Sequence, residues 1–352
     1  MGKRGLYVFV FLVLGLWVRA QDPIYSLSFE QKSWLNPSLI GRDGEGKVRV
    51  SSVHRNLFLP LQGVVHATAA AVDYSFCNSI FALGLNVGSE VQGSGFLQAT
   101  HASGILGIRR NLQRDWVLNG GLQLGMVQQS INWDSYVFSD QLNPIFGAIY
   151  PSSNENLRLS SRMAADVGFG MDITRFRYGK NGSKNGANVG FAWMHLTNAS
   201  NVGILNNYVL PRRLTVHGSF IRRPNPSNAA RSIQLMWRVD RQAQFTNILA
   251  RFQYYLRDEL NMGLGYRGSM AFSGTLHSPV FSLGFSVSEQ LNIQVLYESS
   301  WGNGRLVGAG NTFEIGIVLR SATSHCLHGV HGSRGSRSVC PVFHKTKTAP
   351  GF

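Results

Sequence analysis

Apolar and polar residues alternate along many stretches of this chain, and this period of two constrains the fold more than any other feature. In residues 312–319, Phe313, Ile315, Ile317 and Leu319 alternate with residues that are mostly small or polar. Such an alternation places the apolar side chains on one face of a β-strand. A helix is disfavoured because the alternating stretches are rich in Gly, of which the chain contains 39. The pattern therefore predicts an all-β protein.

Fourteen stretches show this strand pattern, with 12 or 16 strands as alternative counts. They are residues 47–54, 65–75, 78–86, 100–110, 116–127, 163–173, 188–197, 213–221, 231–239, 244–256, 259–270, 280–288, 291–300 and 311–320. Most have about the nine to eleven residues that a tilted strand needs to cross hydrocarbon. Outer-membrane barrels have short periplasmic turns and longer external loops. The connections follow this rule except at 174–187 and 240–243.

We therefore predict a transmembrane antiparallel β-barrel of about 14 strands over residues 47–320. A propeller is disfavoured because the chain shows no self-similarity over about 40 to 50 residues. A soluble β-sandwich stays open as an alternative. The barrel is favoured because aromatic residues cluster near the strand ends, where interfacial girdles lie. These residues are Trp116, Tyr254, Tyr255, Tyr266 and Tyr297.

Both ends of the chain carry features of an exported protein. Residues 1–20 resemble a secretory signal peptide, in which Lys3 and Arg4 precede an apolar stretch and Ala20 lies at the expected cleavage site. Residues 21–46 then form an N-terminal segment, which we expect on the periplasmic side because the strand count is even. No later apolar stretch is long enough for a membrane helix. Residues 321–352 form a basic tail without acidic residues. We therefore predict an outer-membrane protein.

The same alternation places several polar side chains opposite the apolar face, and therefore inside the barrel. They are Arg238, Arg251, Gln253, Glu298 and Glu314. A charge that faced lipid near the membrane midplane would cost about 2–4 kcal/mol. We expect lumenal ion pairs that rigidify or fill the barrel, with a lining for a solute pathway as the alternative.

The residues give no support for catalysis or for a cofactor, because no catalytic, nucleotide-binding or zinc-protease motif is present. The formal net charge is +15, but Lys and Arg form no run of the kind that binds nucleic acid. We expect lipid phosphates or periplasmic partners as counter-charges.

One cluster contains residue types that bind metals, namely His325, Cys326, His328, His331 and Cys340. Its spacing matches no standard zinc site. A zinc site, a Cys326–Cys340 disulfide and a flexible tail with free or externally paired thiols all stay open. We expect Cys77 to be a packed small residue.

Two short motifs follow the expected cleavage site, Gln21-Asp22-Pro23-Ile24-Tyr25-Ser26 and Leu35-Asn36-Pro37-Ser38-Leu39-Ile40-Gly41. Pro23 and Pro37 favour extended or turn geometry in the preceding residue, and Gly41 is free to adopt a positive φ. This pair resembles the mature N-terminus of the PorP/SprF family, and the resemblance continues through Arg55 to the last strand. The sequence departs from the family pattern at Ser38, where Ala is usual, and in lacking an aromatic residue at the end of the last strand.

The resemblance implies an outer-membrane β-barrel of the type IX secretion system of Bacteroidota, which also serves gliding motility. The implied partners are the periplasmic ring lipoprotein and its companion, a peptidoglycan-associated lipoprotein, or the sorting domain of a secreted adhesin, together with outer-membrane lipids. The candidate partner-binding or structural residues are Asp22, Pro23, Tyr25, Ser26, Leu35, Asn36, Pro37, Leu39, Gly41 and Arg55. A porin or a hydrophobic-solute transporter is the rival function.

Overall fold

A computed structural model of the protein describes most of the chain after the expected signal peptide. The described residues are 22–57, 65–93, 97–113, 115–133, 137–143, 145, 147–148, 161–178, 183–197, 209–223, 231–256, 259–271, 274–303, 311–321 and 326. The predicted cleavage site and most of the basic tail, including Cys340, lie outside these residues. Within the described part of the chain, no helix is both long enough and apolar enough to cross a membrane.

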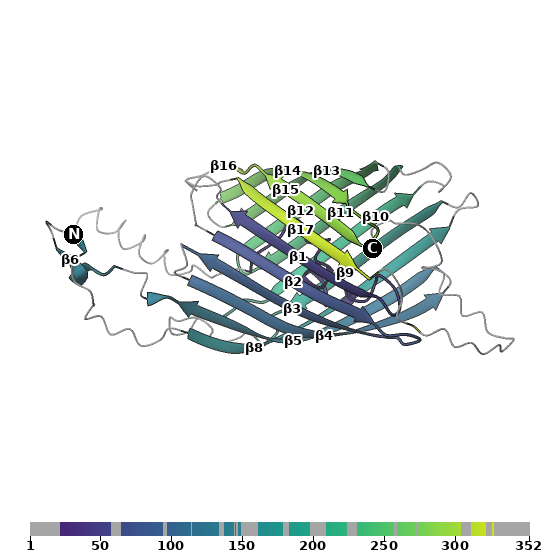
Figure 1. The fold of residues 1–352 in the computed structure, drawn as a ribbon, viewed down its shortest axis with the longest axis horizontal. Helices are drawn as coiled ribbons and strands as arrows, with labels where there is room; N and C mark the ends of the chain where they lie inside the picture. Colours follow the sequence, from purple (N-terminus) through teal and green to yellow (C-terminus); the bar gives the residue numbers. More distant parts are fainter. Residues whose placement is uncertain are drawn as a thin grey trace, which may run out of the picture.

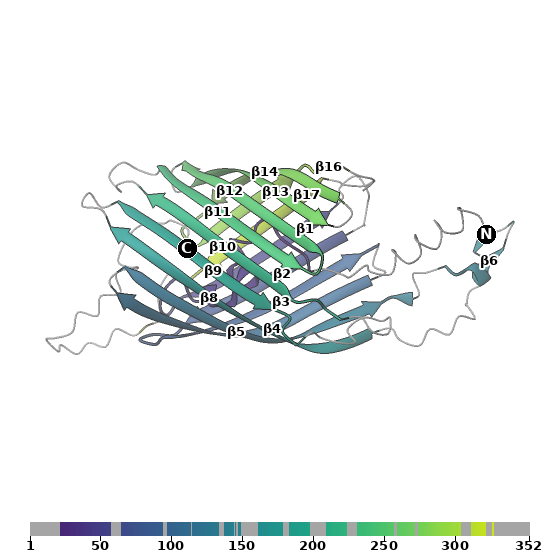
Figure 2. The same ribbon diagram turned by 180° about the vertical axis from the view of Figure 1, so that it is seen from behind.

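Fourteen antiparallel strands form the wall of a closed barrel in the described part of the chain (Figures 1 and 2). They are β1 (Val48–Leu57), β2 (Val65–Ser75), β3 (Phe81–Gln92), β4 (Leu97–Gln113), β5 (Trp116–Ile131), β8 (Ser161–Tyr178), β9 (Lys184–Met194), β10 (Arg213–Arg223), β11 (Arg231–Gln242), β12 (Phe245–Leu256), β13 (Leu260–Ala271), β14 (Gly274–Ser286), β15 (Leu291–Glu298) and β17 (Thr312–Arg320). Each strand pairs with its neighbours along the chain, and β1 pairs with β17 to close the ring. The short β16 (Trp301–Asn303) lies beside β14, while β6 (Leu142–Asn143) and β7 (Gly147–Ala148) pair with each other.

Every one of the fourteen predicted strands overlaps one strand of this wall, so the predicted fold is confirmed. The predicted connection 174–187 seemed too long for a turn. It is shorter in the structure, because β8 continues to Tyr178 and β9 already begins at Lys184. We call the two ends of the barrel the turn end and the loop end. The turn end carries the connections 76–80, 114–115, 179–183, 224–230, 257–259 and 287–290, and the start of β1. The loop end carries the longest connection, 132–160.

The wall has an apolar outer face and a polar inner face, because side chains alternate along each strand. On β3, Leu83, Leu85 and Val87 point outward and are about half exposed, whereas the residues between them are buried. The five polar residues predicted to face the lumen are all buried, at exposures of 0 to 4 %. This prediction of the inner face is confirmed.

Residues 22–46, which we call the lumenal segment, lie inside the barrel. This segment contains the short helix α2 (Lys32–Leu35) and the 3-10 turn η2 (Pro37–Leu39). Asp22 contacts His195 and Arg213 at the loop end, whereas Gly41 contacts Asp73 near the turn end. The segment therefore runs through the barrel from the loop end to the turn end.

We expected this segment on the periplasmic side together with the basic tail, and the structure places it in the lumen. The physical reason is that the inner face of the wall carries charges that need partners when they are removed from water. The lumenal segment supplies those partners, as described below. Which membrane face each end of the barrel meets stays a prediction.

Candidate functional site

The lumenal segment and the inner wall around it form the candidate site, and Asp22 anchors its first residues. The Asp22 carboxylate accepts hydrogen bonds from His195 Nε2 at 2.5 Å and from an Arg213 guanidinium nitrogen at 2.9 Å. Its backbone N–H donates to Gln242 Oε1 at 3.1 Å. His195, in the loop after β9, also contacts Asp166 through Nδ1 at 3.0 Å. Burial alone would lower the pKa of His195, but Asp22 and Asp166 raise it to about 9.

The next anchor joins Ser26 and Leu27 to two glutamates of the wall. The two carboxylate oxygens of Glu314 accept the backbone N–H groups of Ser26 and Leu27 at 2.8 and 2.7 Å. The Ser26 hydroxyl donates to Glu298. Arg55 lies 3.3 Å from Glu314 and 3.5 Å from Glu298, which neutralises part of this buried negative charge. The first family motif therefore lies against β1, β15 and β17.

Two arginines of β11 and β12 also hold this stretch. Arg238 donates to the Tyr25 carbonyl at 3.0 Å, and Arg251 contacts the Ser26 carbonyl at 3.4 Å and the Glu30 carboxylate at 2.5 Å. These contacts come from β11 and β12. Acids of β15 and β17 and arginines of β11 and β12 thus hold the same stretch of the chain.

Asn36 connects the second family motif to the middle of the wall. Its side-chain amide nitrogen lies 3.1 Å from the Met171 carbonyl, 3.0 Å from the Phe191 carbonyl and 2.9 Å from His217 Nε2. Its side-chain oxygen accepts from Ser38, at 2.9 Å from the backbone nitrogen and 2.8 Å from the hydroxyl. The Asn-Pro pair therefore caps η2 and hydrogen-bonds to β8, β9 and β10 at once.

Glycines on the inner face create the space for this segment. A Cβ atom at Gly121 would lie 2.3 Å from the Pro37 carbonyl carbon, and one at Gly170 would lie 1.9 Å from Asn36 Oδ1. Gly88 leaves room for the Trp34 ring in the same way. Glycine in a strand often marks a place where another backbone approaches closely. The wall is thus shaped for residues 34–38.

At the turn end, Gly41 and Asp43 complete the attachment. Gly41 has a φ of +67° and donates its N–H to Asp73 at 2.8 Å, and a Cβ there would meet Ala82 at 2.6 Å. Asp43 pairs with Lys32 at 3.2 Å and with Arg49 at 3.2 Å. The positive φ that the motif suggested for Gly41 is therefore required here.

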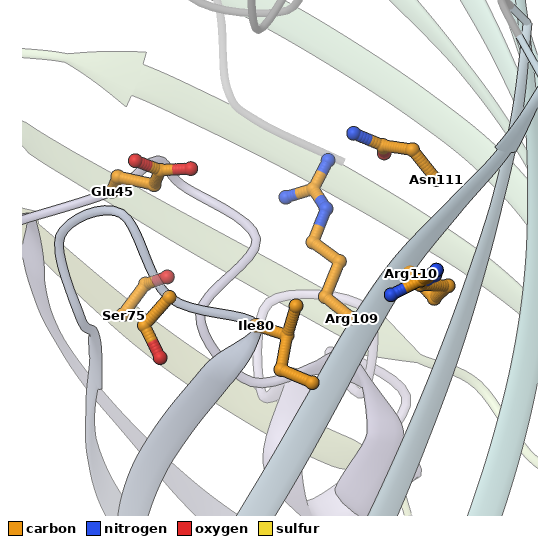
Figure 3. Close-up of a pocket in the computed structure, with 7 residues that line it drawn as sticks. Glu45, Ser75, Ile80, Arg109, Arg110 and Asn111 are labelled. Atoms are coloured by element: carbon orange, nitrogen blue, oxygen red, sulfur yellow. The ribbon is translucent and has the colours of Figure 1, made fainter. Parts of the chain in front are cut away.

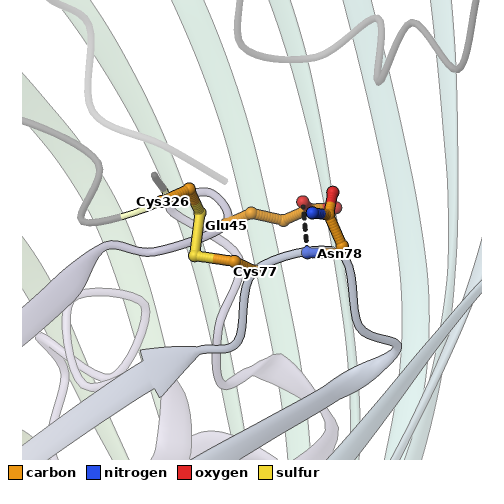
Figure 4. Close-up of a disulfide and its surroundings, with 4 residues drawn as sticks. All are labelled: Glu45, Cys77, Asn78 and Cys326. Atoms are coloured by element: carbon orange, nitrogen blue, oxygen red, sulfur yellow. Dashed lines mark hydrogen bonds between the residues drawn. A yellow bond between two sulfur atoms is a disulfide. The ribbon is translucent and has the colours of Figure 1, made fainter. Parts of the chain in front are cut away.

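A disulfide and a pocket lie at the turn end, close to where the lumenal segment leaves the barrel. Cys77 in the β2–β3 turn is bonded to Cys326, and Glu45 accepts a hydrogen bond from the Asn78 backbone at 3.1 Å (Figure 4). The neighbouring pocket has a volume of about 310 Å³ (Figure 3). Its lining residues are Glu45, Ser75, Ser79, Ile80, Arg109, Arg110 and Asn111. Along the lumenal segment itself, the described pockets are only about 20 Å³ each.

The disulfide corrects two expectations, since Cys326 bonds to Cys77 instead of Cys340 and Cys77 is not a free packed residue. Barrel closure explains the pairing. The N–H of Ser321, just after β17, donates to the Val48 carbonyl at 2.9 Å, and Val48 pairs with Tyr74 of β2. The chain after β17 therefore begins next to the β2–β3 turn, although Cys77 and Cys326 are 249 residues apart in sequence.

All ten candidate residues of the family motif belong to this one arrangement, and all but Pro23 are buried. The sequence did not reveal their wall partners, such as His195, Arg213, Asp73 and His217. These residues lie on inward positions of strands or directly after one, so alternation could have flagged most of them as lumenal. Among the described residues, no group of three or more His, Cys, Asp or Glu side chains could hold a metal ion.

A family model described as "Type IX secretion system membrane protein PorP/SprF" matches residues 18–319. No curated protein sequence matches the chain significantly. Solved structures with a similar arrangement include a KdgM porin, with 8 % identity over 77 % of this chain and 98 % of that chain and a TM-score of 0.34. The CymD monoaromatic hydrocarbon channel has 11 % identity over 84 % and 93 % of the two chains and a TM-score of 0.46. The toluene transporter TbuX of Ralstonia pickettii has 10 % identity over 83 % and 92 %, with a TM-score of 0.41.

Proposed function

Because the chain belongs to the PorP/SprF family of type IX secretion system membrane proteins, we propose that this outer-membrane β-barrel acts by binding secretion partners and conducts no solute. The observation that carries the proposal is the lumenal segment, which runs from one end of the barrel to the other. A solute pathway through the lumen would require this segment to move.

The contacts of the segment explain why it would stay in place. Asp22, Ser26, Asn36 and Gly41 are each held by at least one hydrogen bond from or to the wall. Several of these bonds involve charged groups, which contribute about 1.5–3 kcal/mol each. Removing the segment would also take from Glu298 and Glu314 the hydrogen bonds that Ser26 and Leu27 donate to them. The filled lumen therefore favours a scaffold over a pore.

This arrangement also changes the role that we propose for the family motif. The motif residues face the inside of the barrel, so we assign them to holding the lumenal segment and not to direct contact with partners. Partner contacts then belong to the two ends of the barrel. The turn end offers a described pocket beside the disulfide, in which Arg109 extends between Glu45 and Asn111 (Figure 3).

We assign the partners by family membership. They are the periplasmic ring lipoprotein and its companion, a peptidoglycan-associated lipoprotein, or the sorting domain of a secreted adhesin. The barrel would provide a fixed outer-membrane point to which one of these proteins binds, without forming or breaking a covalent bond.

Three measurements test this function. Deletion of the gene from its host should reduce export of one or more proteins that carry the sorting domain, and the tagged barrel should co-purify with at least one proposed partner. The purified barrel should give no steady conductance in planar bilayers. Normal export in the deletion strain would contradict the secretion role, whereas a stable open channel would favour the porin or solute-transporter function.

A further inference from the structure

Four exposed arginines point outward at the turn end of the barrel, and all lie on one side of the wall. They are Arg110 on β4, Arg175 and Arg177 on β8, and Arg222 on β10. The strands β4, β5, β8, β9 and β10 are consecutive neighbours in the sheet. We call these four residues the arginine arc.

Strand register brings members of the arc close together. Arg177 of β8 and Arg222 of β10 both pair with Asn185 of the intervening strand β9. Arg175 pairs with Trp116 of β5, and its guanidinium carbon lies 5.1 Å from the centre of the Trp116 ring. An arginine over a Trp face forms a favourable cation–π contact. Arg175, Arg177 and Arg222 thus share one surface with Trp116, and Arg110 pairs with Leu118, two residues from Trp116 on β5.

On β4, β8 and β10, the outward residues change from apolar to basic near the turn end. Ile108, Ile173 and Phe220 are exposed outward two residues before Arg110, Arg175 and Arg222, respectively. Since outward side chains recur every two residues, each arginine follows directly on the apolar band. The hydrocarbon of the membrane contacts that band, so the arc lies where lipid headgroups begin.

The outer surface carries little negative charge to balance the arc. All acidic residues of the described strands are buried and point inward, namely Asp73, Glu90, Asp166, Asp172, Asp240, Glu298 and Glu314. Among the described acids outside the strands, Asp115 in the β4–β5 turn is the nearest in sequence to Arg110, and its backbone carbonyl accepts the Phe176 N–H at 2.8 Å. On β3, β14 and β17, the outward residues Phe81, Phe285 and Leu319 at this end are apolar and exposed. The positive charge is therefore local to one side of the barrel.

We infer that the arginine arc binds the headgroups of anionic phospholipids in the leaflet at the turn end. A guanidinium group donates two parallel hydrogen bonds to phosphate oxygens, and it does so with full charge at any physiological pH. Trp side chains favour the same interfacial depth. Basic clusters at a membrane surface attract anionic lipid, and each added arginine strengthens this attraction. The arc would hold anionic lipid on one side of the barrel and orient the barrel relative to it.

Native mass spectrometry of the purified, delipidated full chain tests the inference. Phosphatidylglycerol and phosphatidylcholine would be added at equal concentration, and we expect the wild type to bind phosphatidylglycerol preferentially. The variant Arg175→Gln/Arg177→Gln/Arg222→Gln should bind phosphatidylglycerol at least about tenfold more weakly, since each arginine is worth roughly fivefold. Arg241→Gln is the matched control, because Arg241 is an exposed outward arginine at the loop end of β11.

Three outcomes would overturn the inference. They are equal binding of the two lipids by the wild type, unchanged lipid binding by the triple variant, and an equal loss in Arg241→Gln. Folding of the triple variant is judged by its heat-modifiable migration. If this variant does not fold, the preference of the wild type for phosphatidylglycerol over phosphatidylcholine still tests the inference. Should the triple variant lose a protein partner while the wild type shows no lipid preference, the arc would bind an acidic protein surface, and the lipid assignment would be wrong.

Discussion

Replacement of Gly121 by alanine should displace the lumenal segment while leaving the barrel wall intact. The added Cβ would lie 2.3 Å from the Pro37 carbonyl carbon, 2.4 Å from its oxygen and 2.5 Å from the Ser38 nitrogen. All three atoms belong to the backbone, so no side-chain rotation can relieve the overlap. Ordinary contact begins at 3.4 Å, and the segment must therefore move by about 3.4 − 2.3 = 1.1 Å.

The energetic cost follows from the neighbouring contacts. Overpacking of a well-packed site typically costs about 1–3 kcal/mol. Asn36 directly precedes Pro37, and a shift of this size would break its hydrogen bonds to the Met171 and Phe191 carbonyls, each of which is worth about 1 kcal/mol. The sum is about 3–5 kcal/mol. Since about 1.4 kcal/mol corresponds to a factor of ten, the ratio of seated to displaced segment should fall at least about a hundredfold.

Planar-bilayer conductance is the appropriate assay, because a displaced segment opens the lumen. We expect frequent channel openings in Gly121→Ala and none in the wild type. Gly104→Ala is the matched control, since a Cβ at this outward glycine of the adjacent strand β4 would meet no heavy atom within 4 Å. If Gly121→Ala is as silent as Gly104→Ala while both variants migrate as folded barrels, the inferred close packing of the segment is wrong.

Three further predictions concern the wall, the disulfide and the loop end. Leu235→Arg should lower the yield of folded barrel in the outer membrane much more than Gln234→Arg, because Leu235 is 48 % exposed on the lipid-facing side. A charge on that side costs about 2–4 kcal/mol near the midplane. Equal yields of the two variants would show that the strand register is wrong. Peptide mapping without reductant should recover Cys77 linked to Cys326, and Cys77→Ser should destabilise the barrel by about 2–4 kcal/mol, whereas a Cys326–Cys340 peptide would contradict the pairing. Because the pKa of His195 is raised from 6.5 to about 9, the stability that its charged form contributes is complete below about pH 6.5 and is lost as the pH rises through about 9. The wild type should therefore lose more thermal stability between pH 7 and pH 10 than His195→Gln does. Identical losses in the two proteins would refute this reading of the site.

The strands could be predicted because their signal is local. Alternation within about ten residues suffices to locate a strand and to separate its two faces, and the inward position of Glu314 followed directly from it. Strand ends were less accurate, as at β8, which begins at Ser161 and ends at Tyr178 against a predicted 163–173. Backbone pairing with β5 and β9 extends β8 beyond the stretch in which its own sequence alternates clearly.

The contacts inside the barrel could not be predicted, because they join residues that are distant in sequence. Ser26 and Glu314 are 288 residues apart, and Cys77 and Cys326 are 249 apart. The motif resemblance identified Asn36 and Gly41 as special and identified the family, but no local pattern indicated that they lie inside the wall. The inward glycines Gly121 and Gly170 could have indicated a filled lumen. A glycine in a strand often marks a place where another part of the backbone approaches closely.

The location of Glu314 has a consequence for how the barrel is made. This residue belongs to β17, the last strand of the chain, yet it binds the backbone of Ser26 and Leu27 near the beginning of the described chain. Its strand also forms the seam with β1, from which Arg55 reaches the same carboxylate. Seating of the first residues and closure of the seam therefore depend on the same side chain, which arrives last during synthesis. The contacts that hold the first residues therefore form only when the strand that closes the barrel is present, which couples filling of the lumen to closure of the wall.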